Sequence, residues 1–343
     1  NVAAVPLATC AFTLAFLLIF LPYTVFHEAI SWMIQGVLWI SRQSYGMLTI
    51  GHVPFLWVLL FYFMTGLWIW KKNGQNRHIR ISLAYVIMII LIWIPMARRK
   101  SLAFLDVGQG DCFVADTKSG AIIFDGGSSS EDQVGRYRIL PYMKYLGYQK
   151  IQIAVISHMD IDHYSGIKEL LEMGKIKYLG LPEIPKDETM KKIIGIAKKR
   201  GTTIFYLSRG RQITTKDGSL KVLHPQKNSQ MEKNAASLVM QGKILGYRVL
   251  LTGDVEKEGE EELLSEELER ADILKAAHHG SKNSTSNEFL QKVQPKQTVI
   301  SCGKQNRYGH PHLETIHRLQ TYHTKIYRTD RSGAIIFFKR RDG

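Results

Sequence analysis

The sequence predicts a layered α/β domain over residues 101–343, preceded by an apolar segment over residues 1–100. After residue 100, short β-branched runs alternate with amphipathic stretches, which is the pattern of βαβ units. Before it, the chain is largely apolar and carries eight basic residues against a single acid, Glu28. This change in composition indicates two domains, one in a membrane and one in water.

Long uncharged runs predict that the N-terminal segment crosses a membrane. No charge occurs over residues 2–26, a length sufficient for roughly 30 Å of hydrocarbon. We expect further spans over residues 52–70 and 81–97, and an interfacial helix or a re-entrant segment over the shorter, tryptophan-bearing run 29–40. Basic residues flank the third span at both ends, so charge alone leaves the side of the following domain open. The chain begins with Asn1 and lacks a charged leader, so we interpret it as a fragment of a longer multi-pass protein.

Charge and cysteine content restrict the function only loosely. The chain carries a net charge of +15, of which +8 lies after residue 100. This excess is compatible with an anionic partner but does not require one. Its cysteines, Cys10, Cys112 and Cys302, fit neither a disulfide framework nor a CxxC zinc site.

The α/β domain is expected to open with strands that end in glycine turns. The run SLAFLDVGQGDCFVAD alternates apolar residues before two glycines, and AIIFDGG repeats a strand followed by a turn. Asp106 and Asp125 stand at these strand ends, where carboxylates commonly shape tight turns. We therefore interpret both as turn residues.

The densest group of potential metal ligands is SHMDIDH, residues 157–163. An apolar run, KIQIAVI, predicts a buried strand before it, and SGIKELLEM predicts a helix after it, with Ser165 near the N-cap. The group therefore lies on a loop at the carboxyl end of a strand, where α/β sheets place their chemistry. A polar surface turn is the alternative, but two imidazoles and two carboxylates this close are explained most simply by bound cations.

Alternating elements continue after this loop. KYLGLPEIP predicts a strand and turn, KKIIGIAKKRG an amphipathic helix with a solvated lysine face, and TTIFYLS another strand. Asn234 then precedes a strand in NAASLVM, where an asparagine either caps a turn or contacts a substrate oxygen.

Three further strand ends carry polar residues. The strand YRVLL ends in a turn with Asp254, and ADILKAA ends in His278 and His279. Neighbouring side chains on a regular strand point to opposite faces, so only one of these histidines is expected to bind metal. We favour His279, with His278 left to contact substrate or give a proton, although the reverse order stays open. The strand QTVIS leads into NRYGHPH, a basic loop in which Arg307 and His310 are candidate phosphate contacts.

Taken together, the motifs SHxDxDH, LDVGQGD, LTGD and HHGS resemble the C-terminal domain of the ComEC-type DNA-internalisation competence proteins. These proteins belong to the metallo-β-lactamase superfamily, and the resemblance covers about residues 101–340. It implies an αββα sandwich of two quasi-equivalent halves, for which the similar endings of IAVISHMD and QTVISCGK are supporting evidence. It also implies an aspartate that orients a metal-binding histidine, a role we weigh for Asp111, and a substrate contact at Ser281.

The resemblance further implies two divalent metal ions. The first is expected to bind His158, Asp160 and Asp254, and the second Asp162, His163, Asp254 and His279. Asp160 stands where the HxHxDH signature of the superfamily has its second histidine. Because carboxylate oxygen is a harder ligand than imidazole, Mn²⁺ is favoured and Zn²⁺ remains possible.

By the same resemblance, the expected function is a membrane-anchored nuclease of DNA uptake that degrades one strand of incoming DNA. Two ions about 3.5–4 Å apart would activate water and share the charge on phosphorus, with Asp162 holding one of them and His278 or His310 protonating the leaving oxygen. DNA would be held by its phosphates independently of sequence, at the cell membrane, outside the cytoplasm and beside other uptake proteins. Two alternatives stay open: another hydrolase of this fold acting on small esters, lactams or phosphodiesters, or a non-catalytic module that guides DNA.

Overall fold

The computed structural model describes residues 31–32, 34–36, 38–39, 51–70, 99–231, 234–266 and 268–340. The chain divides into two compact units, residues 1–49 and 50–343. The expected spans at 2–26 and 81–97 lie outside the described residues, and the expected interfacial helix at 29–40 is described only in part, as helix.

An apolar helix, α3 (Phe55–Trp70), lies within the predicted span at residues 52–70 and is 16 residues long. Large side chains at its start, such as Phe55 and Leu56, are more than 70% exposed. Among the described residues, we find no helix that combines the length and the hydropathy needed to cross a bilayer.

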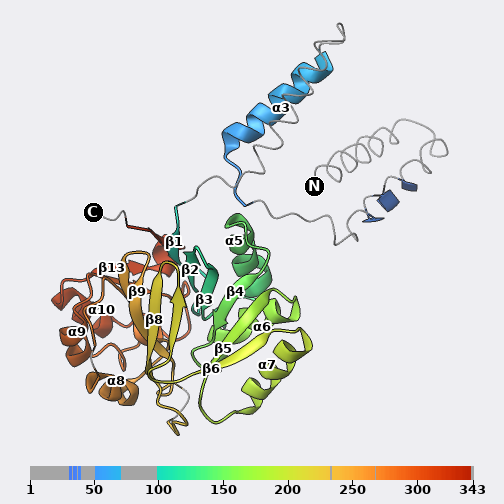
Figure 1. Ribbon diagram of the computed structural model, residues 1–343. Helices are drawn as coiled ribbons and strands as arrows, with labels where there is room; N and C mark the ends of the chain where they lie inside the picture. The colour runs from blue at the N-terminus through green and yellow to red at the C-terminus, as the bar shows by residue number, and fades with distance from the viewer. Residues whose placement is uncertain are drawn as a thin grey trace. The chain divides into compact units, whose positions relative to one another are not determined.

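Two seven-stranded sheets make up the α/β domain (Figure 1). In spatial order the first sheet contains β14 (Ile335–Phe338), β1 (Ser101–Phe104), β2 (Phe113–Thr117), β3 (Gly120–Phe124), β4 (Ile151–Val155), β5 (Ile176–Pro182) and β6 (Thr203–Leu207). The second contains β13 (Lys325–Arg328), β12 (Gln297–Ile300), β11 (Ile273–Lys275), β10 (Tyr247–Leu251), β9 (Val239–Ile244), β8 (Gly218–His224) and β7 (Gln212–Thr215).

The two sheets share one design. Each joins antiparallel hairpins to a parallel run, β3 to β6 in the first sheet and β10 to β13 in the second. This repetition agrees with the expected quasi-equivalent halves. By position in the parallel run, however, β4 corresponds to β11, and β12 corresponds to β5. The similar VIS endings therefore occur on β4 and β12, two strands that are not equivalent in the topology.

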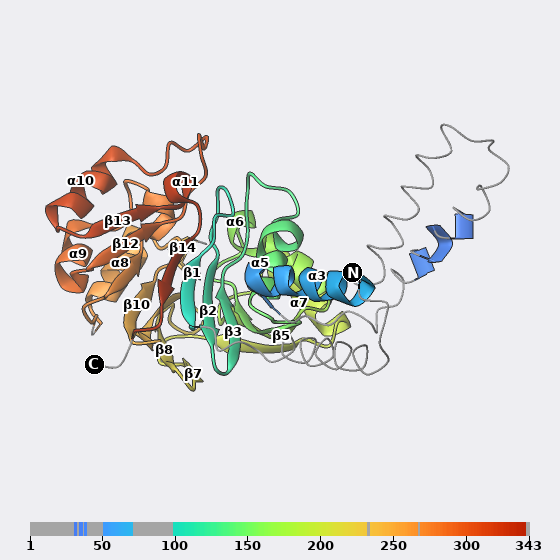
Figure 2. The ribbon, with the colours of Figure 1, turned by 90° about the horizontal axis from the view of Figure 1, so that it is seen from above.

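Helices cover the outer faces of both sheets, as Figure 2 shows from above. The first sheet carries α5 (Leu140–Tyr145), α6 (Ile161–Glu172) and α7 (Glu188–Lys199), and the second α8 (Lys257–Leu264), α9 (Asn287–Val293) and α10 (Leu313–Thr321). Short turns complete the domain: η2 (Gly135–Ile139), η3 (Ala277–Gly280) and α11 (Thr329–Ser332).

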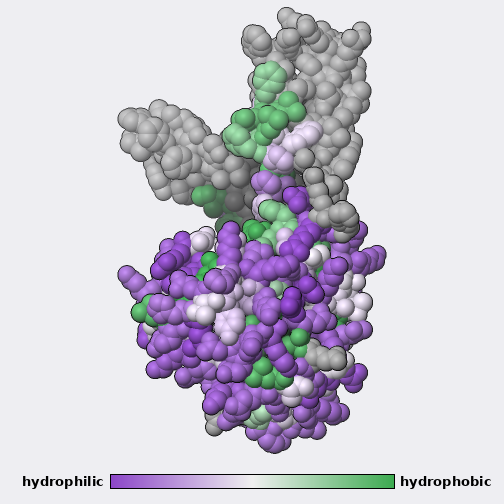
Figure 3. Space-filling view, turned by 90° about the vertical axis from the view of Figure 1, so that its left-hand side faces the viewer, coloured by the Kyte–Doolittle hydropathy of each residue, from purple (hydrophilic) through white to green (hydrophobic). Residues whose placement is uncertain are grey.

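The hydrophobic core forms three clusters, one for each interface between layers. One lies between the first sheet and its helices and includes Ile123 and Ile167, and another lies between the sheets and includes Phe104 and Val249. The third, which includes Phe289, packs the second sheet against its helices. Buried apolar area in all three interfaces stabilises the αββα order, which confirms the predicted sandwich over residues 101–343. The outer surface in Figure 3 is mainly hydrophilic over the α/β domain.

Candidate metal centre

The SHMDIDH segment connects β4 to α6. The helix begins at Ile161, four residues before the expected N-cap at Ser165, so Asp162 and His163 lie in its first turn instead of on a free loop. Gly127 makes this arrangement possible, because a Cβ at that position would lie 2.6 Å from both the carbonyl carbon of Asp162 and the backbone nitrogen of His163. The glycine turn after β3 therefore packs directly against the start of α6.

His163 and His279 each turn one ring nitrogen toward a fixed partner and the other toward a buried centre. Nδ1 of His163 lies 3.0 Å from Oδ2 of Asp125, and Nδ1 of His279 lies 2.9 Å from the carbonyl oxygen of Ser301. An imidazole that donates from Nδ1 keeps a lone pair on Nε2, so both rings are oriented to bind a metal through Nε2. Both Nε2 atoms are buried and make no hydrogen bond to any residue that the structure describes.

His158 is also held through Nδ1, but by serine hydroxyls, which can donate or accept. Its Nδ1 lies 3.0 Å from Oγ of Ser157 and 3.2 Å from Oγ of Ser237. Its buried Nε2, which also makes no hydrogen bond within the described ranges, is 3.6 Å from Oδ2 of Asp160. The rings of His158 and His163 are 4.1 Å apart, so the two expected ligand sets adjoin each other.

Asp254, at the end of β10, faces these imidazoles. Its Oδ2 lies 3.2 Å from Nε2 of His163 and 3.3 Å from Nε2 of His279, and Oδ2 of Asp162 lies 3.5 Å from the latter. The ligand atoms of Asp254, His163, His279 and Asp111 all lie within 4.8 Å of one another. This is close to the distance that two metal–ligand bonds of about 2.0–2.2 Å can bridge. The N and O donors therefore fit a hard or borderline divalent cation.

The buried carboxylates of the centre favour positive charge beside them. Burial lowers the pKa of His163 and of His279. Asp254 and Asp125 outweigh this effect at His163, and Asp254 and Asp111 outweigh it at His279, so both pKa values lie well above the usual one. Burial raises the pKa of Asp254, but the positive charges of His163, His279 and a lysine outweigh burial. The pKa of Asp254 therefore lies well below its usual value. Protons on the imidazoles thus balance carboxylates that a metal ion would otherwise balance.

That lysine, Lys275, is a site residue that the sequence analysis missed. It ends β11, is 4% exposed, and forms an ion pair with Oδ2 of Asp111. Its Nζ also lies 3.5 Å from Oδ1 of Asp254 and donates to the carbonyl oxygen of Gly253 at 3.0 Å. Burial would raise the pKa of Asp111, but Lys275 and His279 hold it below its usual range. The sequence feature that could have identified Lys275 was its position as the one lysine in the otherwise largely apolar run ADILKAA.

Two aspartates lie beside the Nδ1 atoms of the buried histidines. Asp125, which we interpreted as a turn residue, lies 3.0 Å from His163 and also accepts a 2.7 Å hydrogen bond from the backbone nitrogen of Ser157. Asp111 lies 3.8 Å from Nδ1 of His163 and 3.5 Å from Nδ1 of His279. Asp125 therefore makes the close contact that we had weighed for Asp111.

His278 and His279 do not lie on a regular strand. The strand β11 ends at Lys275, and both histidines adopt left-handed backbone conformations, with φ of 46° and 53°. The prediction that they lie on a regular strand is therefore wrong. His279 belongs to the buried group, whereas Nε2 of His278 lies at its edge, 3.8 Å from Oδ2 of Asp254, and Nδ1 of His278 lies 2.8 Å from Glu256.

The remaining predicted site residues lie around this centre at different distances. The ring of His310 is 5.5 Å from that of His278, and burial followed by the neighbouring imidazoles lowers the pKa of His310 to about 4. Arg307 is exposed and donates to the hydroxyl of Tyr308. Ser281 is buried, and its Oγ accepts from the backbone nitrogen of Asn283, so it shapes the turn after η3.

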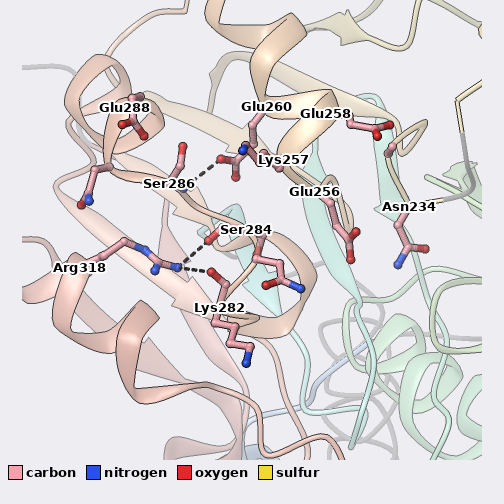
Figure 4. Close-up of a pocket in the computed structure, with 13 residues that line it drawn as sticks. Asn234, Glu256, Lys257, Glu258, Glu260, Lys282, Ser284, Ser286, Glu288 and Arg318 are labelled. Carbon is pink, nitrogen blue, oxygen red and sulfur yellow. Dashed lines mark hydrogen bonds between the residues drawn. The ribbon is translucent and has the colours of Figure 1, made fainter.

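Asn234 lines a hollow of about 970 Å³ beside the centre (Figure 4). Glu256, which contacts His278, belongs to the same wall, so the hollow adjoins the edge of the metal centre. Its charged side chains have mixed signs: Glu256, Lys257, Glu258, Glu260, Lys282, Glu288 and Arg318. Such a lining does not favour a polyanion over other ligands.

Comparison with known proteins supports this interpretation of the fold. Residues 105–304 match the Metallo-beta-lactamase superfamily. The chain is 34% identical to ComE operon protein 3 of Bacillus subtilis (strain 168) over 80% of this chain and 38% of the relative. It is 30% identical to Competence protein ComA of Neisseria gonorrhoeae over 69% of this chain and 32% of the relative.

Among solved structures, the metallo-beta-lactamase fold protein YhfI from Bacillus subtilis is 12% identical, with a TM-score of 0.49, over 69% of this chain and 99% of that one. The chain spans less than two-fifths of the length of the curated relatives named above. The superfamily match covers more than half of the chain, and its ligand-rich loops lie inside the matched residues. The chain therefore belongs to the metallo-β-lactamase superfamily and, within it, is homologous to the competence proteins of the ComEC family.

Proposed function

We propose that this chain is part of a membrane-anchored, metal-dependent nuclease that degrades one strand of DNA during uptake into the cell. One observation carries the catalytic part of the proposal. Nε2 of His158, His163 and His279 is buried without a hydrogen-bond partner in the described part of the chain, and each ring is fixed through Nδ1. A histidine array of this kind, beside Asp254, is the arrangement that a metal-dependent hydrolase requires.

Two sets of residues would hold the ions. One set is His158, Asp160 and Asp254, and the other is Asp162, His163, Asp254 and His279. Two divalent ions, when bound, supply Lewis acidity toward water and a phosphodiester. The oxygen of Asp160 in the first set favours Mn²⁺, with Zn²⁺ as the competing ion.

Side chains around the metal ligands would position the substrate and move protons. His278 has one nitrogen 2.8 Å from the carboxylate of Glu256 and the other directed toward Asp254, so it is placed to give a proton to a leaving oxygen. Its imidazole meets that of His310 edge to face, with ring centroids 5.5 Å apart. A pKa of about 4 leaves His310 neutral near pH 7, which suits a hydrogen-bond partner of the phosphate better than a proton donor.

The substrate assignment rests on the competence relatives and on charge. Residues after position 100 carry a net +8, which attracts phosphates without selecting a base sequence. We also propose that the apolar segment anchors the domain in the cell membrane, on the outer side, near other uptake proteins. Membrane attachment would keep the domain where DNA enters.

The test uses the whole chain in detergent, stripped with a chelator and reloaded with Mn²⁺ or Zn²⁺. Labelled single- and double-stranded DNA are offered beside a chromogenic phosphodiester and a chromogenic lactam, with Asp254→Asn as the inactive control. The proposal expects Mn²⁺-dependent DNA cleavage that Asp254→Asn abolishes, together with loss of metal in that variant by elemental analysis. Lactam turnover without DNA cleavage would favour a small-substrate hydrolase, and metal binding without turnover of any substrate would favour a DNA-guiding module.

A further inference from the structure

Aromatic rings extend in a row from the metal centre to the surface. The ring of His310 is stacked on that of His279 with 6.2 Å between centroids and 29° between planes. Tyr308 is stacked on His310 in turn, at 5.7 Å and 22°. From these two distances, the tyrosine ring lies no more than about 12 Å from the ring of His279.

The outer end of this row is open to solvent and positively charged. Tyr308 is 42% exposed, a large value for an aromatic side chain beside a buried centre. The guanidinium of exposed Arg307 lies 4.9 Å from the ring centroid of Tyr308 and donates to the tyrosine hydroxyl at 2.7 Å. Exposed aromatic surface and a cation thus occur together at the rim.

The loop that carries these residues, between β12 and α10, is held in place. The side chain of Asn306 accepts from the backbone nitrogen of His310 at 3.0 Å and donates to the carbonyl oxygens of Gly303 and His310 at 2.9 and 2.6 Å. Gly309 adopts a φ of +68°, which allows the turn between the two rings. The position of Tyr308 is therefore fixed by the loop before any substrate binds.

We propose that Tyr308 is a stacking subsite for an unpaired nucleobase next to the cleaved phosphate, with Arg307 neutralising the neighbouring phosphate. This inference rests on the proposed nuclease function and adds a preference for single strands. Aromatic rings bind any base through its π-face, which suits a site without sequence preference. A base in a duplex already has both faces stacked, so paired DNA cannot use the subsite.

The binding test uses the whole chain in chelator, so that no cleavage occurs, and fluorescence anisotropy of labelled oligonucleotides. Tyr308→Ala should weaken single-strand binding about tenfold and leave duplex binding unchanged, whereas Tyr308→Phe should bind like wild type. Tyr206→Ala is the matched control, because Tyr206 is 36% exposed on the edge strand β6 and has Lys186 Nζ 5.0 Å from its ring centroid. Equal losses in the two alanine variants would overturn the proposal.

Abasic sites identify what the ring contacts. A strand made entirely of tetrahydrofuran units keeps its phosphates but has no bases, so wild type and Tyr308→Ala should bind it equally. A weaker interaction of the variant with this strand would mean that Tyr308 contacts the backbone, and the subsite would be rejected. If wild type loaded with Mn²⁺ cleaves neither strand, the nuclease proposal fails on its own, because the binding comparison needs no turnover.

Discussion

At the scale of single residues, the buried charges of the centre are organised by partners that bind no substrate. Asp125 is 0% exposed and receives hydrogen bonds from the backbone of Ser157 and from His163, so it joins the end of β4 to the start of α6. The sequence predicted a turn residue, because a carboxylate before two glycines has that role in most proteins. Its contact with His163 depends on the pairing of β3 with β4, which local sequence does not specify.

Asp125→Asn should lower metal content and affinity. An amide can present its NH₂ group instead of an oxygen to Nδ1, which favours the tautomer with the proton on Nε2 and removes the ligand lone pair. We expect metal affinity to fall about 10- to 100-fold, measured by calorimetric titration with Mn²⁺. Asp106→Asn is the control, since Asp106 accepts a hydrogen bond from the backbone of Gly108 in the turn after β1. Equal affinity in wild type and Asp125→Asn would contradict the orienting role.

Lys275 supplies the second residue-scale prediction, which concerns the metal-free protein. The pKa values of Asp111 and Asp254 are lower in the folded chain than in the unfolded one. Their contribution to stability is therefore present above about pH 4 and is lost as the pH falls through the acid range. With Lys275→Met, burial of Asp111 is no longer balanced by the ammonium. The free energy of unfolding at pH 7 should drop by about 3–5 kcal/mol, and the gain in stability between pH 3 and 6 should shrink.

Thermal unfolding in chelator across that pH range measures both effects. Lys296→Met is the matched control, because Lys296 pairs with Asp272 at 2.9 Å but is 65% exposed. Removing an exposed pair should cost about 0–1 kcal/mol. If the two lysine variants unfold alike, Lys275 does not stabilise the centre.

At the scale of elements, the predicted strands and helices were largely correct, and the errors lie at their ends. β11 was expected to continue to His279 but ends at Lys275, and α6 begins four residues earlier than expected. A side-chain contact supports the first of these ends: Oγ1 of Thr285 accepts from the backbone nitrogen of Ala277, which helps to hold the turn η3 after β11. Left-handed conformations at two successive histidines cost about 1–3 kcal/mol each, so they persist only because such contacts fix them. The apolar pattern of the strand contains no sign of this strain.

Gly127→Ala tests how closely these elements approach each other. An added Cβ would lie 2.6 Å from the backbone of Asp162 and of His163, so the first turn of α6 must shift. We expect a loss of about 1–3 kcal/mol in unfolding free energy and weaker Mn²⁺ binding. At Gly195 on α7 nothing lies within 4 Å of an added Cβ, so Gly195→Ala should stabilise the helix by about 0.5–1 kcal/mol. Thermal unfolding of both variants gives the comparison, and equal melting temperatures would contradict the close packing at Gly127.

At the scale of the whole molecule, the sequence pattern predicted a layered α/β fold and the edge at which the metal centre lies, and the family resemblance implied the two layers of sheet. Periodicity identified the strands, and ligands after β4, β10 and β11 converge because the parallel strands of each half end at that edge. Local sequence did not predict which strands of the two halves are equivalent, because the similar VIS endings occur on the non-equivalent strands β4 and β12. Lys275 was missed for a related reason: its partner Asp111 is 164 positions away in the chain and lies in the other half.

The last prediction concerns how the whole domain engages DNA. Within the described ranges, the helices of the α/β domain pack on the sheets, and its basic side chains are dispersed over the surface, so binding should depend on phosphates and hardly on base sequence. Affinity should then fall linearly on a log–log plot against salt, with a slope set by the number of phosphates neutralised. Arg307→Ala should reduce that slope by about one, because it removes one exposed cation at the rim.

Asp162→Ala provides the opposite pattern. Its carboxylate lies 3.5 Å from Nε2 of His279 and faces the centre, so the variant should lose cleavage while its salt slope stays nearly unchanged. Fluorescence anisotropy of labelled DNA in chelator, repeated over a salt series for both variants, separates phosphate contact from metal binding. A flat salt response in wild type, or tight binding to one sequence alone, would mean that the positive charge serves only solubility, and a small-molecule substrate would then explain the centre better.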